Sequence, residues 1–287
     1  MTTCFFATDL HGKSDRYRKL FGAIETNVPA VVFLGGDLLP PFSESLRREN
    51  SIGVGFVDGF LKNGFLRLKE TLKDRYPSVY LILGNDDPRS EEAAIEEVGK
   101  DGLWSYLHDR IVTFGSFKLA GYAFVPPTPF RLKDWERYDV SRFVDPGCVP
   151  PEEGSFSYPV EKREVSRQTI QNDLETLTKG MDFANAAFLF HSPPYDTVLD
   201  RAALDGRMVD HVPLDVHVGS IAIRRFLERA QPLVSMHGHV HESAELTRSW
   251  KGQIGRTHIF GAAHASTELA LVRFTLENPV DATRELL

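Results

Sequence analysis

The chain contains five short polar motifs, and each of them lies at the end of an apolar run. In chain order they are Thr8-Asp9-Leu10-His11, Gly36-Asp37, Gly84-Asn85-Asp86-Asp87, His191-Ser192-Pro193-Pro194 and Gly238-His239-Val240-His241. The apolar runs cover residues 2–7, 30–34, 78–83, 186–190 and 233–236, and continuous runs of this length are typical of strands buried on both faces. The fold must therefore be one in which the ends of several buried strands carry polar groups.

Helical patterns separate the strands in the N-terminal part of the chain. Residues 14–26 predict a helix that Ser14 can cap, residues 55–75 carry apolar side chains at helical spacing, and residues 90–98 predict a third helix. Alternation of strands and helices is the signature of βαβ units, so the sequence predicts an α/β protein.

The later part of the chain continues the pattern with a hairpin, two helices and closing strands. The hairpin is expected over residues 111–123 with its turn at Gly115-Ser116, the helices over 161–180 and 220–230, and the strands over 258–260 and 268–275. The sequence has no repeat of fixed period and no convincing linker. Residues 1–287 are therefore interpreted as a single domain.

The least regular stretch covers about residues 125–160 and is rich in proline. It also carries Phe130, Trp135, Tyr138 and Phe156. One interpretation is a surface loop that packs on itself. The other is a cap or insertion over the functional site, because long ordered loops without secondary structure are often functional.

Composition excludes several classes of protein. With 42% hydrophobic and 25% charged residues, the chain has the balance of an ordinary globular protein. Its net charge of -7 gives no global basic field that would attract nucleic acid or an anionic membrane. There are two cysteines, no basic N-terminal region, and no apolar run near the roughly 20 residues of a membrane span. We therefore expect a cytoplasmic protein without a membrane association.

The motifs supply carboxylates, imidazoles and one carboxamide, which are ligands for divalent metals of borderline hardness. Asp9 and His11 stand two residues apart beyond the first strand, so both side chains can face one crevice. Gly35 and Gly36 precede Asp37 and let backbone and metal approach closely. Because functional groups of an open α/β sheet gather at the carboxyl ends of its strands, the series predicts one shared metal site.

Taken together, the motifs resemble those of the calcineurin-like metallophosphoesterase superfamily over nearly the whole chain, from Asp9 to His241. Two of them, extended to residues 191–195 and 237–243, resemble more narrowly a bacterial and archaeal branch of predicted phosphoesterases. The resemblance implies a four-layer α/β/β/α sandwich, in which helices flank two mixed β-sheets. It also implies hydrolysis of a phosphodiester or phosphomonoester by attack of a hydroxide that bridges two metal ions.

The same resemblance implies a set of metal ligands. Asp9, His11 and His241 would hold the first ion, Asn85, His191 and His239 the second, and Asp37 would bridge both. Asp37, Asn85 and His191 are also expected to act in catalysis. Ions about 3.5–4 Å apart would activate water and clamp the phosphoryl oxygens. Mixed nitrogen and oxygen ligands accept Mn, Fe, Zn or Co, and Mn is named first because Mn and Fe are common in the superfamily.

Two details of the motifs need separate treatment. His237-Gly238-His239 has the same spacing as His239-Val240-His241, and the family places a glycine directly before the first ligand histidine, which selects the second pair. Many family members also carry a general-acid histidine after the motif asparagine, where this chain has Asp86. An aspartate, with a usual pKa near roughly 3.9, is a poor acid at neutral pH. Slow turnover, a preference for good leaving groups, or another donor such as His217 or His264 is therefore expected.

Several other residues have a structural interpretation beside a functional one. Asp87 is expected to brace the turn before Pro88 rather than to bind metal. His217 and His264 are by default structural or surface histidines. Two sets remain open between binding substrate and ordinary roles, namely the loop arginines Arg131, Arg201 and Arg207, which are otherwise solvated, and the aromatic residues Phe130, Trp135 and Tyr138, which otherwise pack the loop.

Three functions compete at this point. The first is a phosphoesterase that acts on a small phosphoester, for which the superfamily implies that homo-oligomers occur although no sequence feature demands one. The second is a catalytically weak member that serves as a metal-containing binding or scaffold module, as Asp86 and the irregular segment suggest. The third is a nuclease, against which the acidic balance and the lack of a basic stripe argue.

Overall fold

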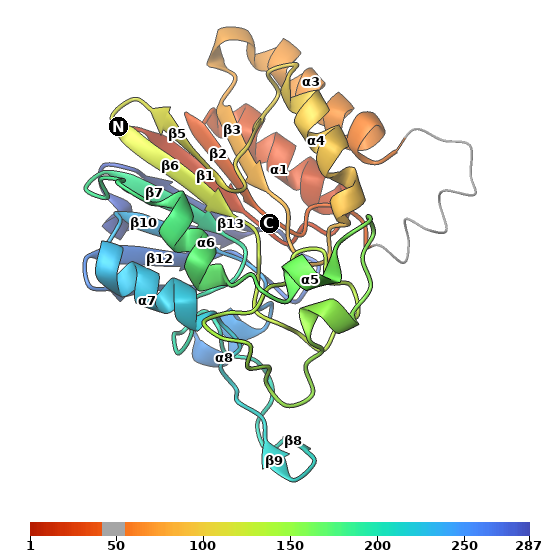
Figure 1. Cartoon of the computed structure of the whole chain (residues 1–287). Coiled ribbons are helices and arrows are strands. Elements are labelled where there is room, and N and C mark those ends of the chain that lie inside the picture. Colours follow the sequence, from red (N-terminus) through yellow and green to blue (C-terminus); the bar gives the residue numbers. More distant parts are fainter. Residues whose placement is uncertain (42–54) are drawn as a thin grey trace.

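The computed structural model describes residues 1–41 and 55–287, and within them the strands form two six-stranded mixed sheets (Figure 1). The first sheet has the spatial order β14-β13-β1-β2-β3-β4, in which β1 to β4 run parallel and β13 and β14 run antiparallel to their neighbours. Its strands are β1 (Thr3–Ala7), β2 (Val31–Gly35), β3 (Ser78–Ile82), β4 (Ser105–Tyr106), β13 (Ala270–Thr275) and β14 (Thr283–Leu286).

The second sheet has the order β11-β12-β10-β7-β6-β5, with parallel pairs in its centre and an antiparallel pair at each edge. Its strands are β5 (Arg110–Phe114), β6 (Phe117–Tyr122), β7 (Ala186–Phe190), β10 (Val234–His237), β11 (Lys251–Ile254) and β12 (Thr257–Gly261). A small separate hairpin is formed by β8 (Met208–Val209) and β9 (Val212–Pro213) and projects from the body of the molecule (Figure 1).

Helices cover the outer face of each sheet, so the expected α/β/β/α layering is confirmed (Figure 1). The first sheet is covered by α1 (Ser14–Asn27), α3 (Lys62–Leu72) and α4 (Glu92–Gly99), and the second by α6 (Ile170–Leu177) and α7 (Ile221–Ala230). The short helices α5 (Lys162–Val165) and α8 (Ser243–Thr247) lie in connections. In the described part of the chain, no helix is both long and apolar enough to cross a membrane.

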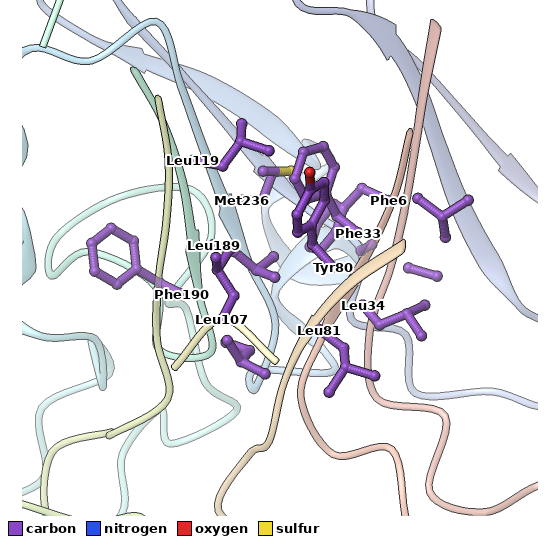
Figure 2. Packing of buried hydrophobic residues seen from close by; sticks show 14 of the residues in the cluster. Phe6, Phe33, Leu34, Tyr80, Leu81, Leu107, Leu119, Leu189, Phe190 and Met236 are labelled. Carbon is purple, nitrogen blue, oxygen red and sulfur yellow. The ribbon is translucent and has the colours of Figure 1, made fainter. Parts of the chain in front are cut away.

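The two sheets pack against each other through apolar side chains of their inner faces. Figure 2 shows this cluster, in which Phe33 and Tyr80 come from the first sheet and Leu119, Leu189 and Met236 from the second. All five side chains are buried. Helices outside and a second sheet inside leave the central strands no solvent face, which is why their sequences are continuous apolar runs rather than alternating ones.

Five strands end near one another and carry the five motifs. β1, β2 and β3 are parallel neighbours in the first sheet, and β7 and β10 are parallel neighbours in the second. Asp9, Asp37 and Asn85 lie in the loops that follow the first three strands, while His191 and His239 follow the other two. Neighbouring parallel strands bring their carboxyl ends to one edge, so the fold collects these residues.

The segment of about residues 125–160 is irregular but ordered around buried groups. Lys133 and Glu136 form an ion pair in which both side chains are fully buried. Thr128 completes it: its N–H and hydroxyl donate to Glu136 at 2.7 and 2.5 Å, and its carbonyl accepts from Lys133 at 2.8 Å. Trp135 is also fully buried. The segment is thus organised around a buried ion pair and a buried aromatic ring.

Some local expectations from the sequence were wrong. The single helix expected over 161–180 is divided into α5 and α6, because Thr169 accepts a hydrogen bond from the N–H of Asn172 at 3.2 Å and starts a new helix. The N–H of Ile170 is bound to the carbonyl of Tyr138 at 2.8 Å. Ser14 does not cap α1; it is the first helical residue, and Lys13 precedes it without a side-chain cap.

A buried neutral histidine, His108, joins the end of β4 to the second sheet. Its Nδ1 accepts a hydrogen bond from the N–H of Ala123 at 3.1 Å, and its ring packs edge-on against Trp135 at a centroid distance of 4.9 Å. Burial, and then the nearby charges of Arg89 and Arg137, hold the pKa of His108 well below its usual value. The folded chain therefore keeps this imidazole neutral.

Replacing His108 with asparagine should make stability less sensitive to acid. The asparagine carbonyl can accept the same N–H without titrating. Below about pH 6.5 the unfolded wild-type chain binds a proton at His108 that the folded chain does not. The wild-type free energy of unfolding should therefore fall with falling pH by up to about 1.4 kcal/mol per pH unit from this group. Urea unfolding between about pH 5 and pH 7 should show a shallower fall for His108→Asn, and equal slopes would contradict this account.

Candidate metal centre

The loops after the strands carry their polar residues in an unusual backbone conformation. Asp9, His11, Asp37 and His239 have positive φ values of 56°, 48°, 50° and 73°. Such conformations are costly for residues other than glycine and persist only where surrounding bonds enforce them. Here the N–H of Asp9 donates to the carbonyl of Gly36 at 2.9 Å, and the N–H of His11 donates to the carbonyl of Asp37 at 2.7 Å. The first two loops are thus tied directly to each other.

One cluster gathers Asp9, His11, Asp37 and His241, whose ligand atoms all lie within 4.8 Å of one another. His241 Nε2 lies 3.1 Å from Asp9 Oδ1 and 3.2 Å from His11 Nε2. Asp9 and Asp37 are buried, whereas the two histidines are partly accessible. Two carboxylates and two imidazoles that converge on so small a volume form a donor set suited to a borderline divalent cation.

A second group of donors lies on the other side of Asp37. His191 Nε2 is 3.0 Å from Asn85 Oδ1 and 3.3 Å from Asp37 Oδ2, and the rings of His191 and His239 have centroids 5.3 Å apart. Asp37 Oδ2 also lies 3.9 Å from His11 Nε2. The structure therefore brings all seven residues of the expected ligand set together, with Asp37 between the two groups.

Hydrogen bonds to the protein orient the donors. His191 Nδ1 lies 2.8 Å from the carbonyl of Gly35, an acceptor, so Nδ1 donates its hydrogen there and Nε2 is directed toward Asp37 and Asn85, where it can hold either a proton or a metal ion. Asp37 Oδ1 accepts the N–H of Asp86 at 2.8 Å, which directs Oδ2 toward the two histidines. The side chains are thus positioned before any ion binds.

Three glycines make this close approach sterically feasible. A Cβ atom at Gly84 would lie 2.3 Å from Asp37 Oδ1, and one at Gly238 would lie 2.3 Å from Thr8 Oγ1 and 2.7 Å from Asp9 Oδ2. At Gly36, with a φ of 96°, it would lie 2.6 Å from His191 Nδ1. Any side chain at these positions would push the donors apart, so the glycines fit a compact metal site.

The electrostatics favour a proton on His191, at one of the positions where a cation would bind. Burial by itself would lower the pKa of His191, but the charge of Asp37 and its hydrogen bond raise it to about 10. Burial, and then repulsion by His191, lower the pKa of His239 to about 4. For Asp9, burial acts upward, but the hydrogen bond and charge of His241 outweigh it and lower the pKa. Cations that bind here must displace protons, so metal affinity is linked to pH.

A family model, calcineurin-like phosphoesterase, matches residues 3–243. The chain belongs to this family. A search of curated proteins gives no match to the sequence. Among solved structures, one crystal structure superposes with a TM-score of 0.61 at 15% identity, covering 99% of this chain and 98% of the other. The protein TT1561 of Thermus thermophilus superposes with a TM-score of 0.56 at 13% identity, covering 99% and 98%. At these identities, the structures show likeness of fold.

Within this phosphoesterase fold, Asp87 and Arg16 bind the backbone of the loops that carry the donors. The Asp87 carboxylate accepts the N–H groups of Leu38, Leu39 and Gly84 at 3.1, 2.7 and 2.9 Å, so it braces the turn as the sequence suggested. Sequence reasoning missed Arg16, a buried residue of α1 whose guanidinium donates to the carbonyls of Asp9 and Ser266. Nothing in the amphipathic pattern of α1 distinguishes this arginine from a solvated one.

The remaining histidines have different surroundings. His237 is buried and lies 2.9 Å from the carbonyl of Ser192 through Nδ1 and 2.8 Å from the Ser235 hydroxyl through Nε2, so both ring nitrogens are engaged away from the donors. His217 Nδ1 lies 2.8 Å from the buried carboxylate of Asp200. His264 Nε2 lies 2.8 Å from the Ser266 hydroxyl.

Asp86 lies at the edge of the first cluster, with Oδ2 3.6 Å from His11 Nδ1. Burial, and then the charge of Asp37, raise the pKa of Asp86 to about 6 from the protein groups alone. A value below neutral pH leaves the carboxyl ionised for the most part at pH 7, and adjacent cations would favour the ionised form further. Burial thus moves the pKa of Asp86 toward the range of a general acid, whereas bound cations would act in the opposite direction.

A cavity of about 530 Å³ opens beside His239. Its walls come from residues 126–148 and 195–221 together with Val240 and Glu242. Of the three aromatic residues considered from sequence, Phe130 lines it with 59% of its surface exposed, whereas Trp135 and Tyr138 are buried. Of the loop arginines, Arg201 is bound to Asp205 at 2.5 Å, so that its guanidinium is neutralised by a neighbouring carboxylate.

Removal of the Asp87 carboxylate should weaken both the fold and the metal centre, although Asp87 touches no proposed ion. In Asp87→Ala, three N–H groups lose their acceptor, and each costs about 1–3 kcal/mol when it is left unpaired. We expect the free energy of unfolding to fall by roughly 2–5 kcal/mol and Mn²⁺ affinity to fall roughly 10–100-fold. Chemical unfolding and calorimetric metal titration measure the two effects.

Asp15→Ala is the matched control, because Asp15 is an exposed aspartate on α1. Its effect on stability should stay within about 0.5 kcal/mol. Unchanged metal affinity in a folded Asp87→Ala protein would show that other contacts hold the two loops in place.

Proposed function

We propose that the protein is a binuclear metal-dependent phosphoesterase that acts on phosphodiesters. The observation that carries the proposal is the position of Asp37, whose Oδ2 lies 3.9 Å from His11 Nε2 and 3.3 Å from His191 Nε2. One oxygen thus faces both groups of donors. This arrangement supports a bridging role, with Asp9, His11 and His241 on one side and Asn85, His191 and His239 on the other.

When bound, two divalent cations supply Lewis acidity, which lowers the pKa of a water nucleophile and neutralises the phosphoryl oxygens. The protein's own groups hold and orient the donor side chains. The tie between Asp9 and His241 fixes the first set of donors, and the hydrogen bond from His191 Nδ1 to Gly35 fixes the second. The mixed nitrogen and oxygen donors accept Mn, Fe, Zn or Co, and Mn is proposed first because the resemblance to the superfamily implies it.

The preference for a diester rests on charge. A phosphomonoester dianion carries one more negative charge than a diester and calls for an arginine or lysine near the phosphate. Within the described residues, the walls of the cavity beside His239 include neither of these residue types. Of the two arginines of the 195–219 loop that were considered from sequence, Arg201 is paired with Asp205, and neither Arg201 nor Arg207 lines the cavity. A singly charged diester therefore suits this site better.

The two candidate proton donors, His217 and His264, differ in their position relative to the cavity. His217 lines the same cavity as the proposed ligand His239, whereas His264 is not among the cavity walls. Asp200 is buried and accepts from the N–H groups of Asp196, Thr197 and Gly219 at 2.9, 2.8 and 3.1 Å in addition to its contact with His217. A carboxylate held in this way orients an imidazole. We therefore propose His217 as the donor to the leaving group.

Metal dependence is the first test of the phosphoesterase. Metal-stripped protein should not hydrolyse bis(p-nitrophenyl) phosphate, and added Mn²⁺ should restore turnover with two ions bound per chain. Asp37→Asn should lower metal affinity and turnover at least roughly a hundredfold, because a direct ligand matters more than the groups behind it. Asp15→Asn should behave as wild type. Retained activity in Asp37→Asn would contradict the assignment of the protein as a phosphoesterase with Asp37 as the bridging ligand. Tight uptake of metal without turnover of any ester would favour the binding-module hypothesis.

The proton donor is tested with esters of the same phosphate and different alcohols. His217→Gln should slow an alkyl ester, which has a poor leaving group, by roughly 10²-fold or more, while the p-nitrophenyl ester changes little. Adding Asp86→His, which restores the family's usual histidine, should recover the alkyl ester in part. Equal losses on both esters would assign His217 a structural role instead. No gain from Asp86→His would contradict the view that the reaction lacks the family's usual proton donor at this position.

A further inference from the structure

The walls of the cavity beside His239 are largely apolar and present exposed aromatic rings. Phe130 and Phe143 line it with 59% and 71% of their surfaces exposed, and Val140, Leu204 and Leu214 contribute further apolar surface. Large exposed apolar side chains are costly to keep in water and are informative when they gather at a cavity. The cavity thus offers a surface on which an apolar group could be buried.

Its acidic side chains are mostly engaged by the protein. Asp139 accepts from the Ser220 hydroxyl and the N–H of Ile221 at 2.5 and 2.6 Å at the start of α7. Asp215 accepts from the Tyr195 hydroxyl at 2.7 Å, and Glu242 accepts from an N–H of the adjacent loop at 3.1 Å. These carboxylates therefore build the walls of the cavity.

Among the described residues, the aspartates and glutamate that line the cavity have no lysine or arginine beside them in its walls. Asp139, Asp145, Asp215 and Glu242 line it, and the part of the chain that the structure describes contributes neither lysine nor arginine to the walls. The imidazole of His217 also lines the cavity, and a positive charge on it would be offset by the carboxylate of Asp200 at 2.8 Å. On the described walls that lie away from the metal centre, an anionic group would meet these carboxylates and neither lysine nor arginine, which disfavours it.

The walls are held in place before any ligand binds. Thr128 belongs to the lining, and the buried Lys133–Glu136 pair fixes it through three hydrogen bonds. Pro126, Pro127 and Pro129 restrict the backbone on either side of it. A preformed cavity loses little conformational entropy on binding, so its shape and chemistry can select a ligand.

We propose that this cavity receives an apolar group without negative charge, an aryl or alkyl group attached to the phosphate that the metal centre holds. The inference names a substrate class for the proposed phosphoesterase and rests on that function only in assigning the phosphate to the metals. It excludes substrates whose organic part is itself anionic, and it accounts for the aromatic residues of the irregular segment by giving them a ligand.

Phosphonates in their singly ionised form test the inference through binding alone, because their P–C bond is not hydrolysed and their charge matches that of a diester. Calorimetric titration of the Mn²⁺-loaded protein should show phenylphosphonate binding at least roughly tenfold more tightly than methylphosphonate. Addition of a carboxylate, in 4-carboxyphenylphosphonate, should abolish that gain. Octylphosphonate separates two sources of apolar group: tighter binding than phenylphosphonate indicates an alkyl chain, and weaker binding indicates an aryl group. Equal affinities for the methyl and phenyl compounds, or no binding of either, would overturn the inference.

Phe143→Lys places a cation at the exposed mouth of the cavity, where a substitution should not disturb folding. It should reverse the order of affinities, so that 4-carboxyphenylphosphonate binds more tightly than phenylphosphonate. Ile111→Lys is the matched control, an exposed apolar residue of β5 outside the cavity walls, and should leave the order unchanged. An unaltered order in Phe143→Lys would contradict the placement. Selective phenylphosphonate binding without phosphodiester turnover would refute the proposed catalysis and leave the cavity assignment standing.

Discussion

The metal centre depends on one constraint: loops that follow five different strands must place their donors within a few ångströms of each other. The chain meets it with left-handed backbone at Asp9, His11, Asp37 and His239. Conformations of this kind cost about 1–3 kcal/mol each, and they persist because hydrogen bonds join the loops. The bonds from Asp9 to Gly36 and from His11 to Asp37 hold the first two loops together, and the Asp87 carboxylate holds the second to the third.

The same convergence makes the fold and the metal site interdependent. Buried carboxylates at Asp9 and Asp37 are compensated by neighbouring imidazoles, and the resulting attraction raises the pKa of His191 to about 10. Cations would take over this compensation and release the protons. Anything that binds the folded chain and not the unfolded chain stabilises it, so the ions would strengthen the architecture that positions them. Arg16 contributes from the opposite side by donating to the carbonyl of Asp9.

Much of the fold could be predicted because its determinants are local. The apolar runs before Asp9, Asp37, Asn85 and His191 are buried strands for the same reason that they are apolar, since both faces are covered. Short edge strands such as β4 and β14 were missed, because two to four residues carry no periodic signal. The break between α5 and α6 was missed because a distant partner, the carbonyl of Tyr138, binds the N–H of Ile170.

The candidate site, like the fold, has a part that could be predicted from the sequence and a part that could not. Its candidate donors lie one to four residues beyond the ends of strands, so short motifs after apolar runs are enough to select them as candidates. The walls of the cavity come from residues 126–148 and 195–221, whose course depends on tertiary contacts such as the buried Lys133–Glu136 pair and the Asp139 cap of α7. A buried lysine has no signature in sequence. The family and a candidate donor set can therefore be predicted from the motifs, whereas the lining of the adjacent cavity depends on how the loops fold around their own buried polar groups.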